Sequence, residues 1–264
     1  MTAGHDGVCV ADDGCRLAYT LTGPADAPPL VLANSLGTDR GLWAAQLEAL
    51  SARHRVLGYD TRGHGRSDAP AGDYTIARLG RDVLALLDHL GVARADVCGV
   101  SIGGLTALWL GIHAGDRVRR LVLANTAARV GSDTFWTERM RLVRDDGVAS
   151  LADVTMERWF TPGFRAARPD VVARMRATLL ATLASGYLGC CAALRDADLQ
   201  NDAASVTAPT LVVTGRHDVA TPPELGEWLA ATIPGARLAT FDAAHLANVE
   251  CAAAFTAAVD QFLS

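Results

Sequence analysis

The sequence has no lysine, so arginine provides all 24 of its basic side chains. Its 29 acidic residues leave a net charge of −5, and this balance argues against nucleic acid as a partner. No C-x-x-C pair or other metal-binding spacing occurs among the six cysteines, so no metal site is expected. Residues 1–7 lack the apolar core of a signal peptide. We therefore expect a cytoplasmic protein with free, buried thiols, rather than a disulfide between Cys9 and Cys15.

Long apolar runs suited to a membrane are also lacking. Residues 97–115 carry no Asp, Glu, Arg or Lys, but they contain five glycines together with Ser101, Thr106 and His113. A sharp turn at Ser101 would divide this segment into a short strand and a buried helix, and neither half would reach the roughly 20 residues of a membrane span. No membrane partner is expected.

The sequence does have the pattern of a single large α/β domain. Half of its 264 residues are hydrophobic, which suits one extensive core. Apolar strand-like runs alternate with amphipathic helix-like ones, and this alternation predicts a mainly parallel sheet flanked by helices. After a hairpin that turns at residues 12–14, strands are expected at 30–33, 56–59, 96–100, 118–124, 210–214 and 237–241, and helices at 42–51, 76–90, 105–114, 222–231 and 249–263.

Residues 126–203 interrupt that alternation, because they show helical patterns at 136–143 and 171–183 but no convincing strand. An ordinary series of crossover helices is one explanation, although a crossover needs only about a dozen residues. We favour a helical cap at 126–203, inserted into a core domain formed by residues 1–125 and 204–264.

A candidate nucleophile lies in the sequence Gly-Val-Ser-Ile-Gly at residues 99–103, between a predicted strand and a predicted helix. A tight strand-to-helix turn brings backbone against backbone, which is why it needs glycine on both sides of the serine. The Ser101 hydroxyl would then stand clear of the sheet at the positive end of the following helix dipole. The motif alone is weak, so the residues that would activate the serine decide its meaning.

A serine hydroxyl attacks only when a histidine removes its proton and a carboxylate holds that histidine, in the chain order Ser, acid, His. Of the seven histidines, only His245 follows the last predicted strand. Asp218 follows the strand before it, at the sheet edge where open α/β sheets bind ligands. Two rivals for the acid are Asn125, which carries no charge, and Asp242, which is only three residues from the histidine.

The polar turn Asn34-Ser35-Leu36-Gly37 follows the first predicted parallel strand. This is where such a fold provides one backbone amide of an oxyanion hole, and we expect Leu36 N–H in that role. The second donor would be the amide of Ile102, the residue after the nucleophile. The plainer alternative is a turn with no catalytic part.

Together these segments resemble the α/β-hydrolase superfamily over essentially the whole chain. Four stretches are also similar to the 3-oxoadipate enol-lactonases, namely residues 33–39 (ANSLGTD), 59–65 (YDTRGHG), 98–104 (CGVSIGG) and 124–127 (ANTA). The superfamily's usual His-Gly at the oxyanion turn is replaced here by Asn34-Ser35, as in those lactonases. The loop at 60–67 resembles a characteristic structural loop of the superfamily.

The resemblance implies a small anionic substrate, 3-oxoadipate enol-lactone, opened through an acyl-enzyme on Ser101 without a cofactor. An arginine of the cap would then meet the substrate carboxylate, because the first part of the cap carries a local basic excess. The candidates for substrate contact are Arg129, Arg139, Arg141 and Arg144, with Trp136 above the lactone ring and Asn34 at the oxyanion turn. Arginines on amphipathic helices more often face water, and that alternative stays open.

Other functions fit the same residues. A general carboxylesterase, a cofactor-free perhydrolase or a carbon–carbon bond hydrolase would use the same serine, histidine and aspartate. A hydrolase-fold ligand receptor can also retain all three side chains, but it would turn over its ligand slowly. The rates on an enol-lactone and on a simple ester distinguish these possibilities.

Overall fold

The computed structural model describes residues 4–264, which form an eight-stranded sheet in the order β1-β2-β4-β3-β5-β6-β7-β8. The strands are β1 (His5–Val10), β2 (Arg16–Thr22), β3 (Pro29–Ala33), β4 (Arg55–Tyr59), β5 (Ala95–Val100), β6 (Val118–Ala124), β7 (Thr210–Gly215) and β8 (Arg237–Phe241). Strand β2 is antiparallel to β1 and β4, and all pairs from β4 to β8 are parallel. The predicted hairpin and the mainly parallel sheet are confirmed.

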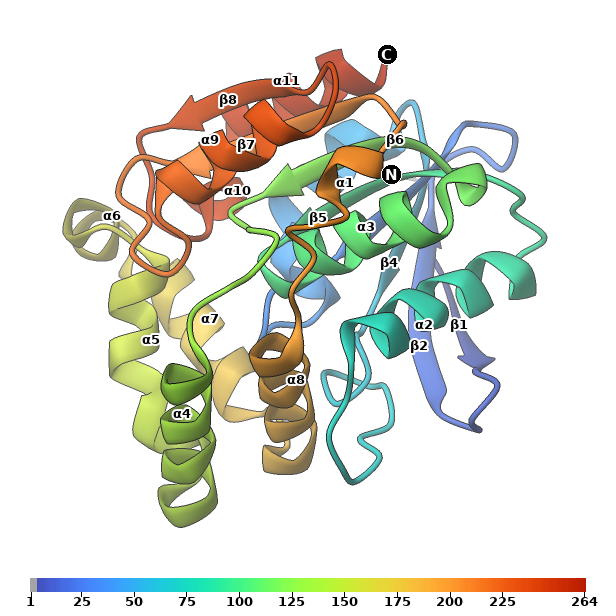
Figure 1. The fold of residues 1–264 in the computed structure, drawn as a ribbon. Coiled ribbons are helices and arrows are strands. Elements are labelled where there is room, and N and C mark those ends of the chain that lie inside the picture. The colour runs from blue at the N-terminus through green and yellow to red at the C-terminus, as the bar shows by residue number, and fades with distance from the viewer. Residues whose placement is uncertain (1–3) are drawn as a thin grey trace.

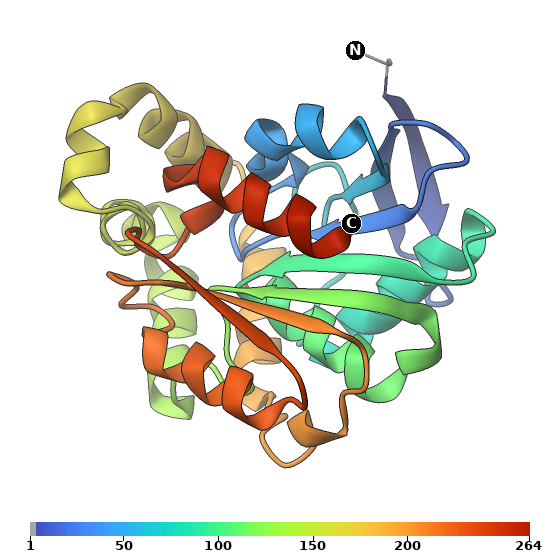
Figure 2. The ribbon, with the colours of Figure 1, turned by 90° about the horizontal axis from the view of Figure 1, so that it is seen from above.

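Helices cover both faces of this sheet (Figure 2). Helices α1 (Ala44–Ser51) and α11 (Ala252–Leu263) pack on one face, and α2 (Ile76–His89), α3 (Ile102–His113) and α9 (Pro223–Thr232) pack on the other. Strand β5 is therefore buried along its whole length, as expected for a central strand covered on both faces. Its carboxyl end positions the candidate nucleophile.

The helix predicted at 249–263 is in fact two helices, α10 (Ala247–Glu250) and α11, separated by Cys251 in a non-helical conformation. The Gln46 side chain donates to the Asn248 carbonyl at 2.7 Å, so that carbonyl is not left for a continuing helix. The break lets α10 hold the loop around residue 245 while α11 packs against α1.

Between β6 and β7 the described chain forms helices and no strand (Figure 1). These are α4 (Asp133–Asp146), α5 (Ala152–Trp159), α6 (Pro162–Ala167), α7 (Pro169–Leu180) and α8 (Ala184–Asp196). Ser132 and Thr161 start α4 and α6 as N-caps, each accepting a hydrogen bond from a backbone N–H three residues on. The group lies at the end of the sheet toward which the arrows of β6 and β8 point.

Cys9 pairs across the hairpin with Leu17, so it does not face Cys15, and all six cysteines are free. Five of these thiols are buried, and Cys251 is half-buried. As to a membrane, no single helix within residues 4–264 is both long and apolar enough to span one. Helices α7 and α8 meet those criteria only as a pair bent by 94°.

Candidate active site

Ser101 occupies a strained turn between β5 and α3, with φ 60° and ψ −121°. The two flanking glycines are required by close backbone approach. A Cβ on Gly99 would lie 2.2 Å from the Gly103 carbonyl oxygen, and a Cβ on Gly103 would lie 2.4 Å from that of Ala33. The expected reason for glycine at both positions is thus confirmed, and the turn sets the serine at the start of α3.

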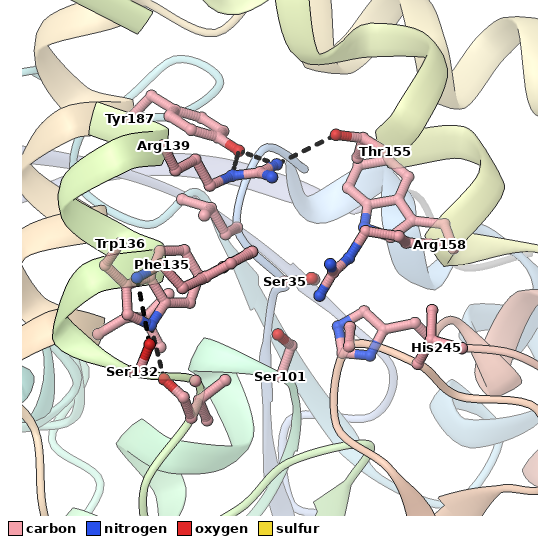
Figure 3. Close-up of a pocket in the computed structure, with 17 residues that line it drawn as sticks. Ser35, Ser101, Ser132, Phe135, Trp136, Arg139, Thr155, Arg158, Tyr187 and His245 are labelled. Atoms are coloured by element: carbon pink, nitrogen blue, oxygen red, sulfur yellow. Dashed lines mark hydrogen bonds between the residues drawn. The ribbon is translucent and has the colours of Figure 1, made fainter. Parts of the chain in front are cut away.

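His245 and Asp218 come together above the carboxyl edge of the sheet. The imidazole Nδ1 of His245 lies 2.8 Å from Asp218 Oδ2, and both side chains are buried. Ser101 and His245 line the same cavity (Figure 3), although no hydrogen bond joins them in the described part of the chain. Catalytic hydrogen bonds of this kind often tighten only when substrate is bound.

The environment of Asp218 keeps its carboxylate ionised. Burial on its own would raise the pKa of this group, but the neighbouring His245 and the hydrogen bonds from His245 and Thr221 outweigh that effect and lower the pKa to about 2. At neutral pH the carboxylate can therefore hold Nδ1–H of the imidazole, which leaves Nε2 free to accept a proton.

Three residues that sequence reasoning did not assign to the site fix this carboxylate. Ala220 donates to it from its backbone N–H at 2.8 Å. Thr221 donates to it from its backbone N–H, at 2.9 Å, and from its hydroxyl, at 2.7 Å. Asn125, which follows β6 with φ 45°, donates from Nδ2 to Asp218 Oδ2 at 3.0 Å and to the Ala244 carbonyl at 3.3 Å. Asn125 is thus not a rival to the acid but a hydrogen-bond donor to it.

The other rival, Asp242, lies away from the cavity. Its carboxylate accepts from His217 Nε2 at 2.7 Å, and the side chains of both residues are largely exposed. Since this pair is in contact with water, it contributes little to the charge near His245.

The turn that follows β3 carries the first expected oxyanion donor. Leu36 lines the cavity beside Ser101, and neither its N–H nor that of Ile102 donates to another described group in a turn or loop. The next amide, Gly37 N–H, donates to His64 Nε2 at 2.9 Å, and Gly37 has φ 78°. His64, from the loop predicted to be structural, thus holds the turn from behind.

His64 makes the folded protein sensitive to acid. Burial lowers its pKa from 6.5 to about 4, and Nε2 must be unprotonated to accept from Gly37. An unfolded chain takes up the proton near pH 6.5, so the contribution of His64 to stability is complete above that pH. It is lost as the pH falls toward 4, by about 3 kcal/mol in all.

Denaturant unfolding at pH 7.5 and pH 4.5 tests this prediction. Between these pH values the wild type should lose about 2 kcal/mol more stability than His64→Gln, whose side chain accepts a hydrogen bond but does not titrate. Equal losses in the two proteins would show that His64 is not the group responsible.

The cavity above Ser101 has a volume of about 310 Å³, at the small end of ligand pockets. Figure 3 shows its walls: α4 supplies Phe135, Trp136 and Arg139, α5 supplies Arg158, and Tyr187 comes from α8. Trp136 is buried, and its ring N–H donates to the Val130 carbonyl, so an aromatic face is fixed in the wall. A small molecule with an apolar ring fits such a site.

Two arginines point into this cavity. Arg139 donates to the Tyr187 hydroxyl, from Nη2 at 2.6 Å, and to Thr155 Oγ1 at 3.1 Å. Arg158 stacks over the Phe135 ring at 5.1 Å, and within residues 4–264 no carboxylate pairs with it. Burial first, and then the charge of Arg139, lower the pKa of Arg158. An anionic ligand group would offset both effects and stabilise the charged form of Arg158.

Several predicted contact residues lie elsewhere. The Asn34 side chain is fully buried, where it donates to the Tyr59 carbonyl and accepts from Trp43 Nε1 at 3.0 Å, so it supports the turn and does not face the cavity. Arg129 is exposed and pairs with Asp133 and Asp198. Arg141 and Arg144 are also exposed on α4. For the arginines of α4 the difference follows from the helix face, because Arg139 is on the side that lines the cavity, whereas Arg141 and Arg144 are not.

Arg158 was missed because its neighbour Glu157 cancels it in a count of local charge. The structure separates the two, since Glu157 is exposed whereas Arg158 is half-buried. A helical projection of 152–159 places Arg158 on the same face as Thr155, three residues earlier, and Thr155 also lines the cavity. Within residues 4–264 no group of three His, Cys, Asp or Glu side chains is arranged to hold a metal.

Comparisons with known proteins agree with this geometry. The family described as alpha/beta hydrolase fold matches residues 28–251. The 3-oxoadipate enol-lactonase 2 of Acinetobacter baylyi is 41% identical over 244 residues, covering 92% of this chain and 91% of that protein. The 3-oxoadipate enol-lactonase 1 of the same organism is 39% identical over 250 residues, covering 95% and 94%.

Among solved structures, the enol-lactonase from Burkholderia xenovorans LB400 has a TM-score of 0.96 to this chain at 45% identity. The match covers 97% of this chain and 99% of that one. The chain therefore belongs to the α/β-hydrolase family, in the group of proteins that includes the 3-oxoadipate enol-lactonases.

Proposed function

We propose that this protein is a carboxylic ester hydrolase that opens 3-oxoadipate enol-lactone to 3-oxoadipate, with Ser101, His245 and Asp218 as its catalytic residues. The observation that carries the proposal is one cavity that holds the serine, the histidine paired with Asp218, and an arginine without a carboxylate partner. The printed activity of its relatives supports the choice of lactone. The free cysteines support a reducing cytoplasm as its location.

In the first half of the reaction the Ser101 oxygen attacks the lactone carbonyl carbon while His245 Nε2 takes the hydroxyl proton. The amides of Leu36 and Ile102 would hold the resulting oxyanion. The ring C–O bond then breaks, and His245 returns the proton to the departing enol oxygen. The product of this half is an acyl-enzyme whose free arm is an enol.

In the second half the enol converts to its ketone, and water attacks the ester carbon of the acyl-enzyme. His245 removes a proton from that water and gives it to the Ser101 oxygen as the acyl bond breaks. One water is consumed, one carboxylate forms, and 3-oxoadipate leaves. Asp218 stays ionised throughout and stabilises the imidazolium.

Residues 126–203 are proposed to act as a cap that recognises the substrate. Trp136 would cover the lactone ring, while Arg139 and Arg158 would meet the carboxymethyl group. Arg139 is held in place by Tyr187 and Thr155, so it is pre-oriented for an anion. Arg158 is the cation that an anionic substrate would pair with most directly.

Replacing Arg158 with Gln should weaken binding of the anionic lactone. A hydrogen bond to a charged group is worth about 1.5 to 3 kcal/mol, so we expect KM to rise about 10- to 100-fold while kcat changes little. The matched control is Arg141→Gln, since Arg141 is exposed on the same cap and is absent from the cavity. If both variants kept the wild-type KM, Arg158 would not bind the substrate.

Hydrolysis in ¹⁸O-labelled water tests the proposed reaction directly. The purified protein should convert the enol-lactone to 3-oxoadipate with one labelled oxygen in the new carboxylate, because water attacks the acyl carbon. Absence of product would refute the lactonase activity. Product without label would refute the acyl-enzyme route.

A further inference from the structure

We propose that Glu250 is a positioning residue that joins the loop carrying His245 to the segment carrying Arg158. Glu250 ends α10, four residues after Leu246, and lies outside the cavity lining. Its carboxylate is the point at which the two halves of the site are tied together. The idea rests on the proposed function only in assuming that the cap arginines meet a substrate anion.

On the catalytic side, Glu250 Oε2 accepts a hydrogen bond from Ala244 N–H at 3.0 Å. Ala244 immediately precedes His245, so the contact fixes the backbone next to the one from which the imidazole projects. Asn125 holds the carbonyl of the same Ala244 at 3.3 Å. The backbone N–H of Ala244 is thus held by Glu250, and its carbonyl is held by Asn125.

On the cap side, the same carboxylate accepts from Thr161. The Thr161 N–H lies 3.3 Å from each oxygen of Glu250, and the Thr161 hydroxyl also donates to Oε1. Thr161 is the N-cap of α6 and lies three residues after Arg158. A backbone hydrogen bond joins the same two segments, from Leu246 N–H to the Trp159 carbonyl at 3.1 Å.

Within the described chain, these are the hydrogen bonds that join residues 148–183 to the core. We call the set of Glu250, Thr161, Ala244, Leu246 and Trp159 the clasp. Because Arg158 and Trp159 line the cavity above Ser101, the clasp sets the distance between the anion-binding cation and the catalytic imidazole. Misplacement of reacting groups by about 1 Å costs up to about 10²-fold in rate, so such a link affects both binding and turnover.

Two esters of the same leaving group separate the two sides of the clasp. The neutral p-nitrophenyl acetate needs only Ser101, His245 and the oxyanion amides, whereas mono-p-nitrophenyl succinate also carries a carboxylate for the cap. Glu250→Ala should lower kcat for the neutral ester about 10-fold and kcat/KM for the anionic ester about 100-fold.

Thr161→Val removes the cap-side hydroxyl and, with it, the N-cap acceptor for Phe164 N–H at the start of α6. It should lower kcat/KM for the anionic ester about 10-fold, through KM, and change the neutral ester by less than about threefold. The control is Glu227→Gln on α9, which removes an exposed carboxylate and should match the wild type on both esters. Thermal unfolding of each variant checks that the measured protein is folded.

Wild-type kinetics from Glu250→Ala on both esters would overturn the clasp. So would a Thr161→Val variant in which both esters lose kcat equally, because that pattern indicates general disruption. If the wild type showed no preference for the anionic ester, the anion site of the proposed function would fail. In that case the kcat of Glu250→Ala on the neutral ester would still test the clasp.

Discussion

Ser101→Ala should reduce kcat for the enol-lactone by about 10⁶-fold, the loss measured when other serine triads lose their nucleophile. In the proposed mechanism the Ser101 hydroxyl oxygen forms the acyl bond, and no neighbouring group in the strained turn would replace it. KM should change little, because the residues proposed to bind the substrate are unchanged. Steady-state rates at high enzyme concentration measure the residual turnover.

A phosphonofluoridate probe adds a second readout of the same residue. In the wild type the Ser101 oxygen should displace fluoride from the probe, so that the protein gains the mass of the phosphonyl group. Ser101→Ala should gain no mass. Ser205→Ala, on an exposed serine outside the cavity, should behave as the wild type. If Ser101→Ala kept most of its activity, the nucleophile assignment would be wrong.

Asp218→Asn should cost about 10⁴-fold in kcat, by analogy with the same change in other triads. An amide nitrogen facing His245 would donate to Nδ1, place the proton on Nε2 and leave no acceptor for the Ser101 hydroxyl. The change also gives up the carboxylate on which Thr221 and Asn125 converge, so the protein should be less stable as well. Rates and denaturant midpoints measured on the same preparation separate the two effects.

Asp242→Asn is the matched control for that experiment. Asp242 pairs with His217 in contact with water, so its loss should change kcat by less than about twofold. If instead Asp242→Asn were inactive and Asp218→Asn active, the acid of the triad would be Asp242.

Much of the fold was predictable because buried parallel strands appear in a sequence as continuous apolar runs. Every predicted strand is present, with ends that differ by at most one residue. Helix α3 was predicted from residue 105 but begins at Ile102, because glycine disfavours a helix interior and the tight turn at Ser101 overrides that preference. Such an override depends on contacts with β3 that no local pattern contains.

That Ser101, Asp218 and His245 would come together was predictable, because each follows the end of a strand; their catalytic roles stay a prediction. The site was not predictable where the face of a cap helix decides it. Arg139 and Arg141 of α4 look alike in the sequence, yet Arg141 forms surface ion pairs and Arg139 enters the cavity. Glu250 could not be found either, since its partners are Thr161, 89 residues away, and a single backbone amide.

The ratio of kcat/KM for 3-oxoadipate enol-lactone to that for p-nitrophenyl acetate distinguishes a lactonase from a general esterase. A cavity with cations for the carboxylate and a fixed aromatic wall should favour the lactone by at least about 100-fold, the value of one well-made charged contact or two weaker ones. Loss of lactone absorbance and release of p-nitrophenol, followed with one preparation, give the two rates. Comparable kcat/KM values on the two substrates would contradict the lactonase assignment and identify a general esterase.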